Sequence, residues 1–494
     1  MRSSGVLLHI SSLPSPHGIG TMGKEAYRFV DFLKKSGQSL WQILPICPTG
    51  YGDSPYQSFS SFAGNPYFID LDIIAKEGLL TKEEIEAADL ECDGEYVNYE
   101  KQYEKRFPLL RKAYDRFAKK LTNKFMQFCR DEAEWLDDYA LFMALKNENG
   151  GKSFENWDKG LKFRHKAAIE RAERRLGREI GFYKFLQYKF TEQWEKLKAY
   201  ANKNGIKIIG DLPIYVARDS ADVWTNPKAF LLDGNLEPKL VAGCPPDAFS
   251  EDGQLWGNPI YNWKYLRSHG YDFWCRRIAR QIKFYDILRI DHFRGFESFY
   301  TIPAKNETAR GGEWKKGPGM SLFNAIKNKL GKLDIIAEDL GYITPEVAKL
   351  LKDSGYPGMK VLQFAFDSRE ESNYLPHTYK NRNSVVYVGT HDNDTAEGWM
   401  LSAAKDDVAY AKRYLGLNKK EGYAWGFIRG AAATVSDTAI YTMQDLLSLG
   451  SEARMNTPSV AYGNWKWRMT KMPSATLEKK LYKLTADFHR LPKE

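Results

Sequence analysis

Eight short runs of apolar, β-forming residues recur along the chain, and segments with helical patterning precede many of them. The runs cover residues 5–10, 39–46, 206–216, 286–293, 333–340, 359–366, 384–391 and 438–446. Several are almost continuously apolar, as in IKIIGDLPIYV and LDIIAEDL, which is typical of parallel strands buried on both faces. Eight strands alternating with helices predict an α/β fold, a (β/α)8 TIM barrel. A doubly wound parallel sheet is the alternative that the same pattern allows.

The segments before three of the runs have the features of barrel helices. KEAYRFVDFLKKSG precedes the second run, FTEQWEKLKAYANKNG the third and PEVAKLLKDSG the sixth. In the last two a glycine stands between the helical pattern and the strand. Glycine is the residue that most often closes a helix C-terminus, so these segments are predicted to be helices that end at the barrel.

The spacing of the runs is uneven. About 160 residues separate the second run from the third, where one βα unit needs roughly 30, and this interval is charge-rich and helical in pattern. A second long interval, between the third and fourth runs, contains the loop-like VAGCPPDAFSEDGQLWGNPIYNW. We therefore expect one catalytic barrel over residues 1–494, with a helical insertion at about 65–200 and an insertion of active-site loops at about 217–275. Long insertions of this kind belong at the carboxyl ends of barrel strands.

Composition excludes several classes of protein. Lysine and arginine exceed aspartate and glutamate by 72 − 63 = 9, and basic and acidic residues are interleaved along the sequence. We therefore expect a surface of mixed charge and not a basic surface that binds nucleic acid. The five cysteines are widely spaced and form no CxxC pair, which argues against a disulfide scaffold or a zinc site and favours a reducing compartment. No secretory segment or run of about 18 apolar residues is present, so we expect a cytoplasmic protein with no membrane partner. Aromatic residues reach 14%, which requires a use beyond ordinary core filling.

A glycine motif near the start of the chain fails as a dinucleotide site. Gly18, Gly20 and Gly23 spell GxGxxG before a predicted helix, but the prolines of LPSPH separate them from the first strand. The acidic residue expected about 20 positions later, which would hold a ribose, is also missing. The glycines are predicted to form an ordinary loop.

Three runs end in carboxylates within apolar surroundings. Arg289 and Asp291 are two residues apart in a strand, so they share a face, and the guanidinium would keep the carboxylate ionised. If the face of Ile336 lines the barrel, Glu338 points inward, where apolar neighbours would raise its pKa and retain a proton. Asp392 follows the seventh run as a third fixed charge. Retaining glycoside transfer needs an ionised carboxylate as nucleophile beside a protonated carboxyl as general acid.

Two other interpretations of these residues stay open. A lone aspartate at a strand end is most often a helix cap or an ion-pair partner. The segment His391, Asp392, Asn393, Asp394 could hold a metal ion, but it has neither the spacing of a calcium loop nor an HExxH pattern. We expect no metal and no organic cofactor.

The motifs RIDHFRG, AEDLG and GTHDND, in this order at strand ends, resemble the signature regions of the α-amylase superfamily. Four further segments resemble the amylomaltase family, the 4-α-glucanotransferases or disproportionating enzymes of glycoside hydrolase family 77: residues 54–71, 210–216, 245–259 and 456–468. The resemblance extends over essentially the whole chain. It implies a TIM barrel without the C-terminal β-sandwich of α-amylases.

The resemblance also implies a role for each residue of a site. Asp291 would be the nucleophile, Glu338 the acid/base, and Asp392 the residue that stabilises the transition state. The residues that would orient Asp291 or bind the substrate are Arg289, His292, His391, Asp211, Tyr56 and Trp256. The partners would be α-1,4-glucan and maltooligosaccharide donors and acceptors. Three hypotheses follow: a retaining 4-α-glucanotransferase, an α-1,4-glucan hydrolase, and a non-catalytic glucan-binding protein.

Overall fold

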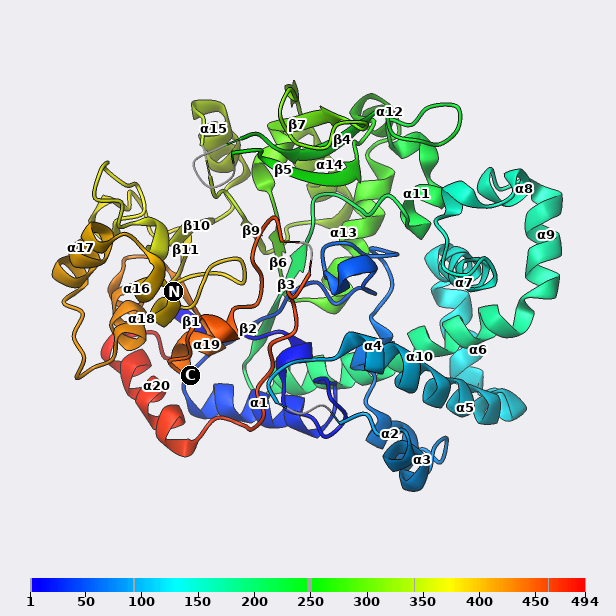
Figure 1. Cartoon of the computed structure of the whole chain (residues 1–494), viewed down its shortest axis with the longest axis horizontal. Coiled ribbons are helices and arrows are strands. Elements are labelled where there is room, and N and C mark those ends of the chain that lie inside the picture. The colour runs from blue at the N-terminus through cyan, green and yellow to red at the C-terminus, as the bar shows by residue number, and fades with distance from the viewer. Residues whose placement is uncertain (1, 92–93, 247–250, 342, 461, 494) are drawn as a thin grey trace.

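The eight predicted strands form one parallel sheet that closes into a barrel (Figure 1). The computed structural model describes residues 2–91, 94–246, 251–341, 343–460 and 462–493. The barrel strands, in chain order, are β1 (Ser3–Leu7), β2 (Leu40–Gln42), β3 (Lys207–Leu212), β6 (Ile287–Ile290), β9 (Ile335–Ala337), β10 (Gly358–Val361), β11 (Ser384–Tyr387) and β12 (Thr438–Thr442). Neighbouring strands pair in parallel in the order β10-β11-β12-β1-β2-β3-β6-β9. The N–H of Ala337 donates to the carbonyl of Pro357 at 2.9 Å and joins the two ends of this order. The prediction of a (β/α)8 barrel is confirmed.

Each strand is shorter than the run that predicted it, because the run continues past the sheet at its carboxyl end. The fourth run extends to residue 293, whereas β6 ends at Ile290 and Asp291 is the first residue beyond it. The N–H of Asp291 still donates to Leu212 at 3.0 Å. The apolar pattern therefore includes the first residues of the loops at the end of the barrel.

The barrel interior is a small apolar cluster to which the barrel strands contribute. Its buried members are Leu7, Leu40, Ile209, Ile336, Met359, Val361, Val385, Tyr387 and Ile440. Ile336 belongs to this cluster, so the face that it shares with Glu338 lines the barrel. The neighbouring Ile335 and Ala337 belong instead to the larger core between the barrel and its helices.

Helices cover the barrel, and those before β2, β3 and β10 lie where the sequence predicts them, whereas the end of the eighth predicted run, residues 443–446, is helix and not strand. They include α1 (Lys24–Lys35), α10 (Gly177–Lys203), α13 (Asp272–Phe284), α14 (Met320–Leu330), α15 (Pro345–Ser354), α16 (Ala396–Ser402), α17 (Lys405–Leu415), α18 (Tyr423–Ala433), α19 (Met443–Leu446) and α20 (Ala475–Asp487). Gly355 ends α15 with a φ of 72°, and Gly205 follows α10 with a φ of 78°. Both have the left-handed backbone that closes a helix.

The interval between β2 and β3 is helical and is drawn in blue to cyan in Figure 1. It contains α2 (Leu71–Lys76), α3 (Lys82–Ala87), α4 (Tyr99–Lys101), α5 (Phe107–Phe117), α6 (Asn123–Asp131), α7 (Ala133–Glu148), α8 (Lys159–Lys162) and α9 (Lys166–Arg175), and leads into α10. Aromatic rings hold these helices together: Phe117 lies 5.0 Å from Phe185 between ring centroids, and Phe125 lies 5.5 Å from Tyr188. Much of the aromatic excess is therefore core of this insertion.

The region that the sequence presents as active-site loops contains a second sheet. Strands β4 (Leu240–Cys244) and β5 (Gln254–Pro259) pair with β7 (Ser298–Pro303) and β8 (Glu313–Lys316) in the antiparallel order β5-β4-β7-β8. Two short helices, α11 (Ala221–Thr225) and α12 (Trp263–Ser268), lie in the same interval. The strands are short and interrupted by residues such as Gly243 and Gly257, and β4 pairs with β7 across the intervening β6. Their sequence has no clean two-residue alternation, so local patterning does not predict them.

Three expectations concern features other than the barrel. The glycines of the GxGxxG motif precede α1 in a segment without a strand, as predicted. Of the five cysteines, Cys47, Cys129, Cys244 and Cys275 have free thiols, and Cys92 lies outside the described residues. Within the described ranges, every helix is too short or too polar to cross a membrane.

Candidate active site

The carboxyl ends of the fourth, fifth and seventh barrel strands bring the predicted catalytic residues to one end of the barrel. Asp291 follows β6, Glu338 follows β9, and Asp392 lies in the loop after β11. The N–H of His292 donates to Glu338 Oε2 at 2.6 Å, and the N–H of Phe293 donates to the Glu338 carbonyl at 3.0 Å. These bonds fix Glu338 against the chain segment that carries Asp291.

Glu338 is 8% exposed. Besides the bond from His292, its Oε1 accepts the N–H of Leu340 at 2.9 Å. Both hydrogen bonds favour the ionised carboxylate, but burial outweighs them and raises the pKa of Glu338 above its ordinary value. A raised pKa is the property that the sequence predicts for this residue, and it allows the carboxyl to hold a transferable proton.

Arg289 links two carboxylates. Its Nη1 donates to Asp211 Oδ2 at 2.5 Å and to Asp291 Oδ1 at 3.2 Å. The contact with Asp291 follows from the two-residue spacing. The contact with Asp211 depends on the register of β3 and β6, which pairs Asp211 directly with Arg289. The Arg289 side chain is 3% exposed, so its charge acts on both carboxylates with little screening by solvent.

The pKa of Asp291 differs from the sequence expectation. Burial, followed in the same direction by the charges of Asp211, Glu338 and Asp392, raises the pKa of Asp291, and Arg289 only opposes this rise. The expectation considered the arginine alone and omitted the nearby carboxylates. Like charges at short distance disfavour ionisation, so Asp291 retains a proton more readily than an isolated aspartate does.

Tyr56 and His391 extend the network from Asp211. The Tyr56 hydroxyl donates to Asp211 Oδ2 at 2.8 Å and lies 2.8 Å from His391 Nε2. Because the Tyr56 hydroxyl donates its hydrogen bond to the carboxylate, it must accept the hydrogen bond from His391, whose Nε2 therefore carries the hydrogen. In a neutral His391 ring, Nδ1 is then the unprotonated nitrogen. Burial lowers the pKa of His391 and supports the neutral form. The two rings are stacked at 5.3 Å.

Asp392 is held by a segment from which the sequence predicts no site residue. Its side chain is 44% exposed, and Asn456 Nδ2 donates to its Oδ1 at 2.6 Å. Arg454 Nη2 donates to the Asp392 carbonyl at 2.7 Å. Asn456 is the first residue of the family-like segment 456–468, and Arg454 lies two residues before it. Nothing in that segment's own pattern indicates that it returns to the loop after β11.

Trp256 lies on β5, and the inserted sheet brings it to the end of the barrel. Its ring makes an edge-to-face contact with His292 at 4.9 Å, and its indole N–H donates to Gln254 at 3.0 Å. His292 has a left-handed backbone with a φ of 54°, an uncommon conformation that recurs at functional sites. Burial lowers the pKa of His292 to about 3, so the ring is neutral. Residues 247–250 of the surrounding motif lie outside the described residues.

The residues of the metal hypothesis are engaged in other contacts. Asn393 Oδ1 accepts the N–H of Thr390 at 2.9 Å, and Asp394 accepts the hydroxyl of Ser451 at 2.8 Å. Across the part of the chain that the structure describes, no group of three or more histidine, cysteine, aspartate or glutamate side chains is arranged to bind a metal ion. These contacts are those of a loop that holds Asp392 in place.

A parallel barrel with a partly exposed carboxylate at the end of its fourth strand and a buried one at the end of its fifth has the fold and the chemistry of an enzyme that acts on glycosidic bonds. A family model described as 4-alpha-glucanotransferase, Glyco_hydro_77, matches residues 8–474. The chain therefore belongs to the 4-alpha-glucanotransferases of glycoside hydrolase family 77, and the resemblance inferred from its motifs is confirmed.

Individual relatives are similar to this chain over at least 95% of their length. The 4-alpha-glucanotransferase of Clostridium butyricum is 51% identical over 98% of this chain and 100% of its own. That of Thermus thermophilus is 47% identical over 95% of both chains. An amylomaltase from Streptococcus agalactiae, solved in complex with acarbose, superposes with a TM-score of 0.97 at 44% identity and covers 100% of both chains. The transferase hypothesis is confirmed over the hydrolase and the non-catalytic alternatives.

Proposed function

We propose that the site carries out retaining transfer of α-1,4-glucan segments, with Asp291 as the nucleophile, Glu338 as the acid/base and Asp392 as the residue that stabilises the transition state. The observation that carries these roles is the asymmetry between two neighbouring strand ends. Burial raises the pKa of both carboxyls, but their hydrogen-bond partners differ. Asp291 accepts a hydrogen bond from the Arg289 guanidinium, which favours its ionised form, whereas the Glu338 carboxyl accepts the backbone N–H groups of His292 and Leu340.

The first step breaks the donor. Glu338 gives its proton to the glycosidic oxygen while an Asp291 oxygen attacks the anomeric carbon, and the reducing-end fragment leaves with the proton. Charge that develops on the sugar ring is stabilised by the carboxylate of Asp392. The product is a glycosyl ester of Asp291, and Glu338 is now ionised.

The second step rebuilds the bond. The 4-hydroxyl of an acceptor glucan gives its proton to Glu338 and attacks the anomeric carbon, and the bond to Asp291 breaks. Two inversions at one carbon give net retention, for which the two carboxyls need to be about 5–5.5 Å apart. The bond from His292, the neighbour of Asp291, to Glu338 supports such a short separation.

The remaining predicted residues divide between the two sides of the cleavage point. Arg289, Asp211, Tyr56, His391 and His292 would hold the donor glucosyl unit and orient Asp291. Trp256 would provide a flat surface for the acceptor sugar next to His292 and keep water from the covalent intermediate. The amylomaltase from Streptococcus agalactiae binds acarbose in its solved complex, which supports a site shaped for sugar rings in this chain.

Incubation with maltotriose tests this function. Transfer yields glucose and a series of longer maltooligosaccharides with a constant number of reducing ends, whereas hydrolysis increases that number. Glu338→Gln should abolish turnover and preserve glucan binding, because the amide keeps the shape of the side chain and cannot donate the required proton. Glu179→Gln, which changes a surface ion pair with Arg111, is the matched control and should retain full activity. Normal turnover by Glu338→Gln would remove Glu338 from the mechanism.

We also infer that the chain is one catalytic barrel with inserted subdomains at about 65–200 and about 217–275, and that it functions in the cytoplasm. The continuous core between barrel and helices supports the first inference. Four free thiols among the described residues support a reducing compartment. Fractionation of the producing cells tests the location, and recovery of the activity outside the cytoplasmic fraction would contradict it.

A further inference from the structure

One face of helix α13 contacts both loops that carry donor-side residues. Arg277, Arg280 and Gln281 are spaced i, i+3 and i+4, so they project from the same side of the helix. All three are at most 5% exposed. Buried, strongly polar side chains on a barrel helix need partners, and here the partners include backbone carbonyls of both loops, besides Glu132 for Arg280 and the Tyr261 hydroxyl for Arg277.

Arg277 binds the turn that follows β3. Its Nη1 donates to Ile214 at 2.9 Å, and its Nη2 donates to the carbonyls of Pro213 at 2.6 Å and Tyr215 at 3.4 Å. Tyr261 completes the arrangement, since its hydroxyl accepts from Nη1 at 3.1 Å and donates to Ile214 at 2.8 Å. A planar guanidinium can reach three successive carbonyls in a way that a lysine ammonium cannot.

The next turn of α13 holds the loop that carries Tyr56. Gln281 Nε2 donates to the carbonyl of Ser61 at 2.7 Å, and Arg280 Nε donates to that of Phe62 at 2.9 Å. The same helix continues into β6, the strand that precedes the nucleophile. Three separate parts of the donor side are thus attached to one rigid element.

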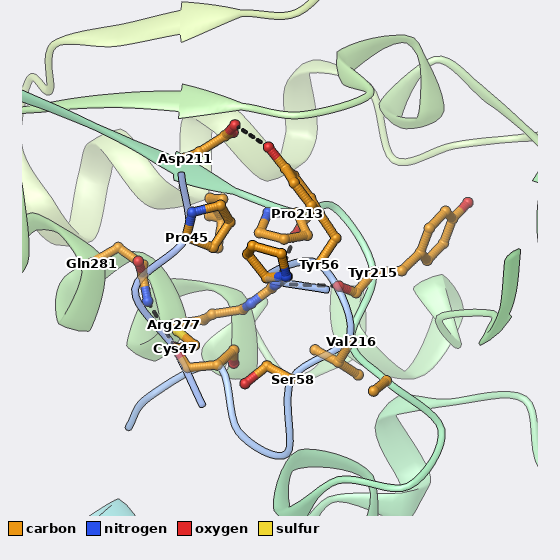
Figure 2. Close-up of a pocket in the computed structure, with 14 residues that line it drawn as sticks. Pro45, Cys47, Tyr56, Ser58, Asp211, Pro213, Tyr215, Val216, Arg277 and Gln281 are labelled. Carbon is orange, nitrogen blue, oxygen red and sulfur yellow. Dashed lines mark hydrogen bonds between the residues drawn. The ribbon is translucent and has the colours of Figure 1, made fainter. Parts of the chain in front are cut away.

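A small cavity separates α13 from the network at Asp211. It has a volume of about 20 Å³ and is lined by Arg277 and Gln281 and by Tyr56 and Asp211 (Figure 2). This is room for about one water molecule and not for a side chain. At this cavity the turn and the Tyr56 loop do not pack directly against α13, so the hydrogen bonds from α13 add to the core packing that holds them in place.

The turn at residues 213–216 also reaches the acceptor side. Asp211 lies two residues before it, and the carbonyl of Val216 at its end accepts from Asn258 Nδ2 at 2.8 Å. Asn258 is on β5, as is Trp256, whose ring lies 6.3 Å from that of Tyr215. A displacement of the turn would consequently move both Asp211 on the donor side and Trp256 on the acceptor side of the cleavage point.

We propose that Arg277 is a positioning residue for the transfer reaction: by fixing the turn 213–216 it aligns Asp211 with the donor and Trp256 with the acceptor. The proposal rests on the roles given above to Asp211 and Trp256. Arg277 itself does not touch the substrate. Its loss should lower the rate of transfer and raise the share of glycosyl intermediate that water intercepts, because the acceptor is held less well.

The test compares Arg277→Met and Arg277→Lys with Arg490→Met. Arg490 is also buried and also donates to several carbonyls, including those of Ser3 and Ala432, but it does so next to the first residue of β1, at the opposite end of the barrel. In the Arg277 variants, kcat for maltotriose disproportionation should fall roughly 10- to 100-fold, with KM changing less, and the ratio of hydrolysis to transfer should rise. Arg490→Met should lower the melting temperature and leave kcat and that ratio unchanged.

Tyr261→Phe keeps the test decisive if the Arg277 variants do not fold. It removes one hydroxyl from the same arrangement and should shift kcat and the hydrolysis ratio in the same direction by a smaller factor. A loss of thermal stability with unchanged kcat and ratio, in the Arg277 variants or in Tyr261→Phe, would overturn the proposal. If Glu338→Gln is inactive in the same assays, such a result leaves the proposed function intact, whereas an active Glu338→Gln contradicts that function itself.

Discussion

The hydroxyl of Tyr56 is the most informative single group to remove. Tyr56→Phe keeps the ring that stacks on His391 at 5.3 Å and lies 5.6 Å from Trp465. It deletes only the donor to Asp211 Oδ2 and the acceptor for His391 Nε2–H. Asp211 is then left with the bond from Arg289, since its Oδ1 has no partner among the described residues. The change therefore isolates one hydrogen-bond bridge between the donor-side residues.

The size of the effect follows from the charge of the acceptor. A hydrogen bond to a charged group contributes about 1.5–3 kcal/mol, and every 1.36 kcal/mol is a factor of ten in rate. If the bridge matters mainly in the transition state, kcat/KM for maltotriose should fall about 10- to 150-fold. In Tyr56→Phe, water that enters the partly exposed site would restore some of the lost hydrogen-bond energy, so the fall in kcat/KM should lie toward the lower end of this range.

The assay is initial-rate glucose release from maltotriose, with the melting temperature of each variant measured in parallel. Tyr200→Phe is the matched control because Tyr200 on α10 donates to Asp31 on α1 at 2.7 Å, the same chemistry on the outer surface of the barrel. Its kcat/KM should equal that of the parent. A correctly folded Tyr56→Phe variant with kcat/KM within twofold of the parent would refute the argument that this bridge orients the site.

Three further outcomes are expected. Asp211→Asn removes a negative charge that raises the pKa of Asp291, so the acid limb of the kcat/KM–pH profile should move to lower pH; an unmoved limb would contradict this. Asn456→Ala should reduce kcat more than it reduces glucan binding measured by calorimetry, because Asp392 loses its side-chain donor; equal losses would indicate a binding role. Burial raises the pKa of Asp445 from 3.8 to about 6, so its ionised form destabilises the fold as pH rises from 4 to 6. Asp445→Asn should therefore stabilise the protein by up to about 3 kcal/mol at pH 8 and by almost nothing at pH 4. Urea titrations at both pH values measure the gain in the free energy of unfolding, and equal gains at the two pH values would contradict this argument.

The barrel and its three carboxylates could be predicted because their signals are local. Strands buried on both faces are apolar throughout, and an i, i+2 pair such as Arg289 and Asp291 shares a face wherever the strand lies. The inward direction of Glu338 follows in the same way from its neighbour Ile336, which lines the barrel.

Other parts of the site depend on which distant segments meet, and local patterns do not contain that information. The second sheet joins β4 and β5 to strands that come after β6, and it carries Trp256 to the barrel. The contact between Arg289 and Asp211 depends on the strand register, and the support of Asp392 by Asn456 comes from a segment 64 residues further along the chain. The pKa of Asp291 could not be predicted from Arg289 alone because it depends on the sum of all neighbouring charges.

The order in which the site is completed has a consequence during protein synthesis. Asp291, Glu338 and Asp392 are translated well before Asn456 and Trp465, whose ring lies 5.9 Å from that of His391. At about 5–20 residues per second, Trp465 leaves the ribosome's active centre several seconds after Asp392. A growing chain thus contains the three carboxylates before the segment that contacts Asp392 and His391 has been added. The contacts of this late segment with Asp392 and His391 can therefore form only when synthesis of the chain is nearly finished.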